Sequence, residues 1–202
     1  MTGGSALRND AATFQDMTGY AARKDQLFAT LSGTVLEIGA GTGANFARLP
    51  AGASWIGLEP DARLRRRLAR NASAHGRSPR VVAAPAERIP IADASVDGVV
   101  GTVVLCSVAD PTQALAEIRR VLRPGGRFLF FEHVAAAPGT RSRRAQRMFA
   151  PLSRRFDHGC DPSRATATTI ARAGFADVEI DWYGEDAWLA IYAPFIAGVA
   201  TN

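Results

Sequence analysis

The stretch LEIGAGTGANF, residues 36–46, decides how the rest of this 202-residue chain is interpreted. The apolar run TVLEIGA (34–40) predicts a buried strand, and Gly39, Gly41 and Gly43 follow at its end. Glycines at this point allow a tight turn and let a ligand approach the backbone closely. The spacing also satisfies the dinucleotide fingerprint GxGxx(G/A), so this stretch by itself leaves an NAD site open as an alternative.

Short apolar runs and helix-like segments alternate after this turn. The further predicted strands are SWIGLE (54–59), RVVAA (80–84), DGVVGTVVL (97–105) and GRFLFFEHV (126–134). These runs lack strict alternation of polar and apolar residues, which is typical of parallel strands buried on both faces. Helices are predicted at 61–75 and 110–122, the second with Asp110 as N-cap and Pro111 at its first position. This order predicts an α/β fold with a doubly wound, Rossmann-like sheet.

The remaining segments complete one domain of residues 1–202. FADVEIDWYG (175–184) and PFIAGVAT (194–201) predict two more strands, close enough in sequence for an antiparallel pair. Segments 1–33 and 135–174 lie outside the strand–helix repeat. We expect both to be helical and to cover the ligand crevice, as an N-terminal lid and a substrate cap.

The composition indicates which binding partners and which cellular compartment to expect. The net charge is +5, but Lys24 is the only lysine, so 23 of the 24 basic residues are arginine. Together with abundant alanine this favours a GC-rich bacterial genome, and we do not expect nucleic acid as a partner. No apolar run approaches the roughly 18 residues of a membrane span, and the N-terminus lacks the apolar core of a signal peptide. We therefore expect a cytoplasmic protein; its oligomeric state stays open.

Two acidic residues help to distinguish between the possible cofactors. Glu59 lies 20 residues after Gly39, where a carboxylate accepts both ribose hydroxyls of NAD or of S-adenosylmethionine (SAM). Glu37 lies inside the first strand, where dinucleotide sites usually have an apolar residue. A carboxylate there suits a ligand that carries an ammonium group, directly or through water. The alternative is that Glu37 caps amides of its own loop.

Four stretches, VLEIGAGTGANF, GLEP, AERIPIADASVDGVV and EIRRVLRPGGRFLFFEH, resemble the successive motifs of class I SAM-dependent methyltransferases. The resemblance implies a seven-stranded sheet with its last strand antiparallel, SAM as cofactor and S-adenosylhomocysteine as product. It places the methionine part of SAM at the glycine turn, the ribose at Glu59, the adenine near Pro60 and 86–87, and the methyl group beside 102–105. Pro85 departs from the pattern, since the family often has an adenine-binding Asp there. The implied cofactor residues are Glu37, Gly39, Ala40, Gly41, Gly43, Glu59, Pro60, Ala86, Glu87, Thr102 and Leu105.

A narrower resemblance concerns the thiol S-methyltransferases of the methyltransferase-like 7 family. It rests on GTGANFARLPAG, DASVDGVVGTVVLCSV, VLRPGGRFLFFEHVAA and FDHGCDPSR. It implies methyl transfer to a small-molecule thiol, such as a xenobiotic or a dithiol natural product. Animal members begin with an apolar membrane anchor that this sequence lacks, so we expect no stable membrane anchor. The alternatives are O-, C- or N-methylation of a small or lipid-like substrate, or a SAM-binding module without turnover.

A thiol acceptor makes modest demands on acid–base catalysis, because a few per cent of a thiol with a pKa of roughly 8.5 is already ionised at neutral pH. His133, at the end of the fifth strand, and Asp157 in FDHGC are the candidate catalytic groups. His133 has the alternative of a hydrogen bond to a neighbouring loop, and Glu132 is as consistent with a structural role as with a functional one. His158, Cys160 and Asp161 lack the four-ligand spacing of a zinc site, so no metal is expected.

Substrate contacts are expected from three places. Met17, Tyr20 and Lys24 stand at helical spacing, as a lid or as core packing. Cys106 is interpreted as a soft pocket-wall residue, with plain burial as the alternative, and the two cysteines form no disulfide framework. The full set of expected substrate-binding residues is Met17, Tyr20, Lys24, Cys106, His158, Cys160 and Trp182. For the arginine-rich stretch 141–156 we expect a solvated basic face over a packed apolar side; a substrate cap, a partner surface and a membrane contact are the alternatives.

Overall fold

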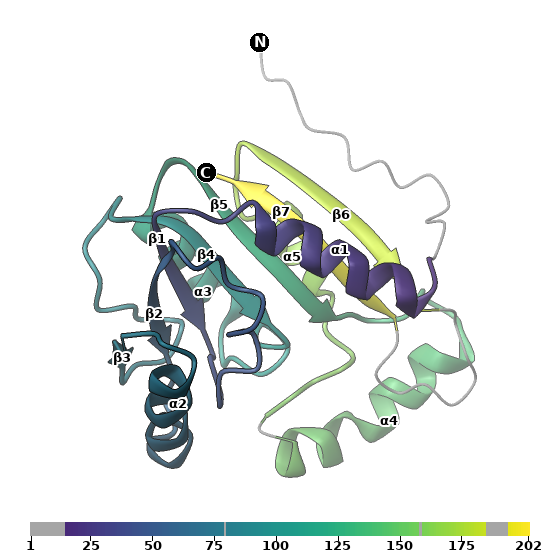
Figure 1. The fold of residues 1–202 in the computed structure, drawn as a ribbon. Coiled ribbons are helices and arrows are strands. Elements are labelled where there is room, and N and C mark those ends of the chain that lie inside the picture. The colour runs from purple at the N-terminus through teal and green to yellow at the C-terminus, as the bar shows by residue number, and fades with distance from the viewer. Residues whose placement is uncertain (1–14, 79, 158, 185–193) are drawn as a thin grey trace.

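A seven-stranded sheet forms the centre of the protein in this computed structural model, which describes residues 15–78, 80–157, 159–184 and 194–202 (Figure 1). The strand order is β3-β2-β1-β4-β5-β7-β6. The strands are β1 (Thr34–Ile38), β2 (Ser54–Leu58), β3 (Val81–Val82), β4 (Val96–Thr102), β5 (Leu122–His133), β6 (Asp177–Tyr183) and β7 (Phe195–Thr201). The helices are α1 (Met17–Ala29), α2 (Ala62–Ala74), α3 (Pro111–Val121), α4 (Arg141–Phe156) and α5 (Thr166–Ala171).

Strands β1 to β5 run parallel, and β7 is antiparallel to both β5 and β6. The expected doubly wound sheet of seven strands with an antiparallel C-terminal pair is therefore confirmed. The last strand in sequence does not lie at the edge; it is inserted between β5 and β6. Because β1 lies between β2 and β4, the carboxyl ends of these three strands meet at one edge, where α/β proteins bind ligands.

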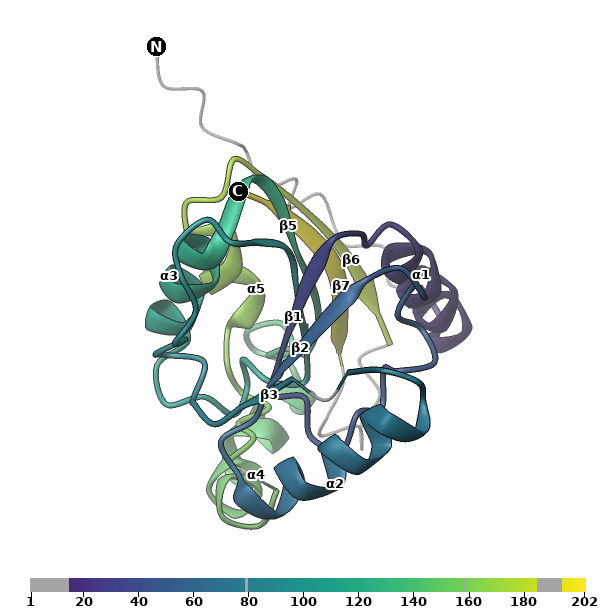
Figure 2. The same ribbon diagram turned by 60° about the vertical axis from the view of Figure 1, so that its left-hand side comes forward.

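Two apolar clusters cover the two faces of the sheet. One packs α3 and α5 against residues such as Phe128 and Phe130, and the other packs α1 and α2 against residues such as Leu129 and Phe131. Successive side chains of β5 therefore point alternately into the two clusters. Figure 2 views the sheet nearly edge-on, with α1 and α2 on one side and α3 and α5 on the other.

The helix starts follow from capping residues. The Asp110 carboxylate accepts from the Thr112 and Gln113 amides, with Pro111 at the first helical position, as the sequence predicts. Asp61 caps α2 in the same way through Arg63 and Leu64. Helix α3 ends one residue before its predicted end, because Leu122 already pairs with Val96 as the first residue of β5.

Helix α4 contradicts the expectation of a packed apolar side. Figure 1 shows it beyond the edge of the sheet at which β5 ends. Its buried residues are Ser142, Gln146, Ala150 and Ser153, whereas its large apolar side chains are exposed: Met148 72%, Phe149 37%, Leu152 56% and Phe156 73%. The physical reason is Gln146, whose side chain accepts from the Ala136 amide (2.8 Å) and donates to the Val134 carbonyl (3.1 Å). A polar anchor thus turns this helix face toward the protein.

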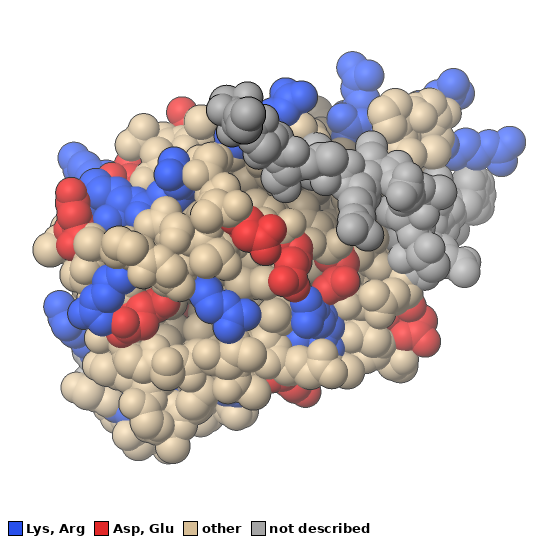
Figure 3. Space-filling view, turned by 90° about the horizontal axis from the view of Figure 1, so that it is seen from above, with Lys and Arg blue, Asp and Glu red and all other residues tan. Residues whose placement is uncertain are grey.

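The surface carries charges of both signs. Over the centre of the face seen in Figure 3, basic and acidic side chains are interspersed. Among the ion pairs of the structure, Arg23 contacts both Glu179 and Asp181. Within the described ranges, no helix combines the length and the apolar character needed to cross a membrane.

Candidate functional site

The glycine turn after β1 leaves an open cradle. Gly39 and Gly41 both have φ of +56°, a conformation that other residues adopt only with strain. A Cβ on Gly39 would lie 2.6 Å from a methyl group of Val104, whereas the nearest atom to a Cβ on Gly41 would be 3.9 Å away. Gly39 is thus required by packing against the β4 end, and Gly41 faces free space. The backbone at Gly41 is therefore accessible to a ligand.

Glu59 connects the end of β2 to this turn. Its carboxylate accepts from the Gly41 amide (2.9 Å) and from the Asp61 amide (2.9 Å), although the residue is buried. Each carboxylate oxygen has more than one lone pair, so both oxygens retain capacity for a hydroxyl donor. The predicted ribose-binding carboxylate therefore lies directly beside the open cradle.

Glu37 is the centre of a buried polar network. Its two oxygens accept from Asn45 Nδ2 (2.8 Å) and Trp55 Nε1 (2.9 Å). Asn45 Nδ2 also lies 3.2 Å from Thr102 Oγ1, which in turn lies 3.3 Å from Lys24 Nζ. Burial raises the pKa of the Glu37 carboxyl above its ordinary value. The network joins β1, β2 and β4 with α1.

Neither Asn45 nor Trp55 is among the site residues predicted from the sequence. Asn45 lies in the motif GANF itself, and an amide that follows a glycine turn is an available signal. Trp55 lies on β2, where Glu37 pairs with Gly57, two residues away on the same face. Only the register of the parallel strands identifies that contact. Neither partner is a backbone amide of the glycine loop, so these two contacts do not support the capping alternative for Glu37.

Lys24 brings a buried ammonium group to the network from α1. It is 8% exposed, and its Nζ lies 4.8 Å from the centre of the Phe131 ring. Burial lowers the pKa of Lys24 to about 8, with Arg48 as the next cause. A desolvated cation with hydrogen-bonding capacity left is suited to an anionic group of a ligand.

Glu132 fixes the end of β4. Its carboxylate is fully buried and accepts from the amides of Val104 (3.0 and 3.1 Å) and Leu105 (3.2 Å). These amides follow Val103, which has the unusual φ of +55° for a β-branched residue. Burial raises the pKa of Glu132 to about 7, against the lowering effect of the backbone hydrogen bonds. Of the structural and the functional role that the sequence leaves open for Glu132, this geometry supports the structural one.

The two candidate catalytic residues lie in different surroundings. The His133 ring packs on Phe195, with 4.5 Å between ring centres, at the end of β5. Asp157 is exposed and forms the C-cap of α4, where its amide donates to Ser153 and its carbonyl accepts from Cys160. His158 lies outside the described residues.

The expected substrate-binding residues lie in different parts of the structure. Tyr20 packs against Tyr183 (5.4 Å between ring centres), Phe131 (6.3 Å) and Phe195 (5.7 Å), which is core packing, and Met17 is exposed. Trp182 packs against the core cluster on the α3 and α5 side of the sheet, opposite Tyr20. Cys106 and Cys160 are both buried and touch each other.

The structure also describes the residues that the family resemblance implies for the adenine and methyl ends of SAM. Ala86 and Leu105 are buried in the core, and Pro60 is exposed. Glu87 accepts from the amides of Ala109 (2.7 Å) and Asp110 (3.2 Å), so it holds the entry to α3.

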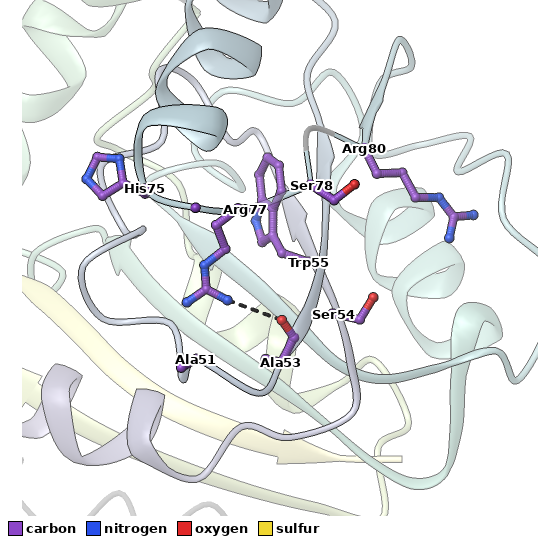
Figure 4. Close-up of a pocket in the computed structure, with 9 residues that line it drawn as sticks. Ala51, Ala53, Ser54, Trp55, His75, Arg77, Ser78 and Arg80 are labelled. Carbon is purple, nitrogen blue, oxygen red and sulfur yellow. Dashed lines mark hydrogen bonds between the residues drawn. The ribbon is translucent and has the colours of Figure 1, made fainter.

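A cavity of about 310 Å³ lies at the other end of the sheet (Figure 4). It is lined by Ser54, the first residue of β2, and by Trp55, His75 and Arg77, among others. The guanidinium of Arg77 donates to the Ala53 carbonyl (3.1 Å), a contact drawn in Figure 4. Because ligands of open α/β sheets bind at the carboxyl ends of the strands, this cavity is not the cofactor site.

Comparison with known proteins agrees with this geometry. Residues 36–130 match the family model described as a methyltransferase domain. The human thiol S-methyltransferase TMT1B is 36% identical over 192 residues, which cover 89% of this chain and 78% of that protein.

Solved structures extend the comparison to the fold. A SAM-dependent methyltransferase of Thermotoga maritima, titled a possible histamine N-methyltransferase, matches with a TM-score of 0.63 at 22% identity, covering 90% of this chain and 88% of that one. The [4+2]-cyclase SpnF matches with a TM-score of 0.69 at 18% identity, covering 93% and 84%. At such identities the likeness shows the fold alone, and one fold serves several reactions.

Proposed function

The chain belongs to the class I SAM-dependent methyltransferases, and from this premise we propose that it transfers the methyl group of SAM to the sulfur of a small-molecule thiol. The observation that carries the choice of sulfur is the 36% identity to a thiol S-methyltransferase over 89% of this chain. The modest acid–base machinery at the strand ends is consistent with this acceptor.

The residues around the glycine turn suit the cofactor. In this proposal Glu59 holds the ribose hydroxyls, and the cradle at Gly41 receives the methionine part. The buried carboxylate of Glu37 favours the ammonium group of SAM through Asn45, and Lys24 favours its carboxylate. When bound, SAM supplies a methyl group already activated by a sulfonium, so alignment of the acceptor provides much of the rate.

The acceptor side requires a nucleophile but no strong base. A thiol with a pKa near 8.5 is partly ionised at neutral pH, and sulfur is intrinsically very nucleophilic. We assign the proton-accepting or thiol-orienting role to His133, with Asp157 as the second candidate. A hydroxyl acceptor is far less ionised at neutral pH, so its methylation would depend more strongly on such a base.

The test compares acceptors that differ in one atom. The purified protein is incubated with SAM and with thiophenol or phenol, benzyl mercaptan or benzyl alcohol, and a reduced quinone. Methylated product and S-adenosylhomocysteine are quantified by mass spectrometry. We expect S-methylation of at least one thiol and no product from its oxygen analogue. Turnover of phenol or quinol without turnover of any thiol would refute the proposal.

Gly41→Ala provides a matched control at the cofactor cradle. Gly76 has a similar φ of +67°, and a Cβ on it would likewise meet open space, but it lies at the end of α2. Both substitutions carry the backbone strain of roughly 1–2 kcal/mol expected for this conformation. We expect calorimetry to show SAM affinity reduced at least tenfold in Gly41→Ala and unchanged in Gly76→Ala. Equal affinities in the two variants would remove Gly41 from the cofactor site.

A further inference from the structure

The two cysteines of the chain, 54 positions apart, lie against each other at the end of β4. The Sγ atoms of Cys106 and Cys160 are 3.4 Å apart, and both residues are buried. The spacing of the residues in the sequence gives no sign of this contact. Neither thiol has a required part in the proposed methyl transfer, because SAM is itself the activated donor.

The backbones that carry the two thiols are already fastened together. The amide of Asp161 donates to the Cys106 carbonyl (2.9 Å), and the amide of Cys160 donates to the Asp157 carbonyl (2.8 Å). Arg164 adds a second link, because its guanidinium donates to the carbonyls of Leu105 (2.9 Å) and Val108 (2.6 Å). The thiols therefore face each other at a high effective concentration, with little loop entropy left to lose.

The surroundings also make the two sulfurs unequal. Their mutual hydrogen bond lowers the pKa of Cys160 and raises the pKa of Cys106, and burial raises the pKa of Cys106 further. Cys160 follows exposed Asp157 within a few residues, on a short loop that contains Gly159. Cys160 is 3% exposed and Cys106 is 0% exposed. Cys160, with its lowered pKa, is thus the sulfur that is oxidised first, and Cys106 is the one that stays protonated.

We propose that Cys106 and Cys160 form a reversible redox-modification site, in which a hydroperoxide oxidises the pair to an intramolecular disulfide. The Cys160 thiolate attacks the O–O bond, giving a sulfenic acid and releasing hydroxide, which takes up a proton as water. The Cys106 sulfur then attacks the Cys160 sulfur: the S–S bond forms, the S–O bond breaks, and a second water leaves with the Cys106 proton. In sum, two thiols and one hydrogen peroxide give one disulfide and two waters.

The disulfide would act on the crevice through the β4 end. Forming a bond of about 2.05 Å from a 3.4 Å contact moves the segment 159–161 and the β4 end by roughly 1 Å relative to each other. Val104, two residues before Cys106, packs on Gly39 of the glycine turn. A displacement of this size next to reacting groups is enough to lower a rate 10²-fold. Oxidation therefore lowers methyl transfer, an effect that rests on the proposed function.

The test follows the crosslink and the turnover in the same samples. The folded protein is treated with hydrogen peroxide, remaining thiols are alkylated, and a tryptic digest is analysed without reductant. Trypsin releases Cys106 in peptide 89–119 and Cys160 in peptide 156–164. We expect these two peptides to be joined, two hydrogens lighter than their sum, and to separate with dithiothreitol. Turnover should fall at least tenfold with the crosslink and return on reduction.

Cys160→Ser and Cys106→Ser are the controls, each compared with its own turnover before peroxide. They retain the same methionines as the parent, so oxidation of methionine affects all three proteins alike. Neither variant should lose turnover reversibly, and Cys106→Ser should retain a Cys160 sulfenic acid that dimedone traps. Two free thiols after peroxide, a disulfide between two chains, or a crosslink that leaves turnover unchanged would each overturn the proposal. If the reduced protein methylates no acceptor, the proposed function fails, and the peptide crosslink still decides the modification site.

Discussion

A single carboxylate, Glu132, shows how one residue ties the fold to the candidate site. Its oxygens satisfy the amides of Val104 and Leu105 just after a residue with positive φ, so it holds a turn that the backbone alone disfavours. The sequence predicts that Glu132 lies near the end of a buried strand, and it leaves the role of the side chain open. The decisive information is the neighbouring strand β4, which comes within hydrogen-bond reach only after the sheet is assembled.

Glu132→Gln should flatten the pH dependence of stability. The pKa of the folded carboxyl is raised from 4.5 to about 7, so between these values the folded protein binds more protons than the unfolded chain. The unfolding free energy therefore falls as the pH rises through this window, by up to about 1.4 kcal/mol per pH unit. A glutamine oxygen still accepts from both amides but does not titrate. Denaturant titrations at pH 5, 6, 7 and 8 should show stability shifting in favour of Glu132→Gln as the pH rises.

Glu117→Gln is the control for this measurement. Hydrogen bonding by Arg120 lowers the pKa of Glu117, so its titration lies below the pH range of the experiment. The stability difference between Glu117→Gln and the parent should stay constant from pH 5 to pH 8. A constant difference for Glu132→Gln as well would contradict the raised pKa of Glu132.

At the scale of elements, the sequence predicts what depends on local pattern. The order of strands and helices and the cap at Asp110 are confirmed, because apolar runs and capping residues act within a few positions. The early start of β5 and the orientation of α4 were not predictable, since both depend on partners distant in sequence. Helix α4 has a clear apolar stripe, yet the contacts of Gln146 oppose the orientation that the stripe predicts.

Gln146→Leu should therefore weaken the protein although it buries a more apolar side chain. It leaves the Ala136 amide and the Val134 carbonyl without the partner that Gln146 provides, and a buried unsatisfied group costs about 1–3 kcal/mol. We expect the unfolding free energy to fall by about 3 kcal/mol in a urea titration. The reverse change, Leu152→Gln on the exposed stripe, should alter it by less than about 0.5 kcal/mol. Similar values for both variants would show that Gln146 does not hold α4.

At the scale of the whole molecule, motifs predict the family and topology predicts where the motifs meet. The glycine turn and Glu59 come together because β1 and β2 are parallel neighbours, which the strand–helix alternation already implies. The Cys106–Cys160 contact has no such rule behind it. Cys160 reaches β4 through an irregular loop after α4, and no periodicity specifies the path of such a loop.

The Cys106–Cys160 contact also predicts how crosslinking changes the unfolding free energy of the whole molecule. A disulfide between Cys106 and Cys160 would close a loop of 54 positions in the unfolded chain, and the chain-entropy model gives a stabilisation of about 4 kcal/mol for that length. Strain from drawing the sulfurs together subtracts from this value, so we expect peroxide-treated protein to gain about 2–4 kcal/mol in denaturant titrations without reductant. Dithiothreitol should abolish the gain, and Cys160→Ser should show none. A loss of stability on crosslinking would mean that the loop and the β4 end resist the approach that the 3.4 Å contact predicts.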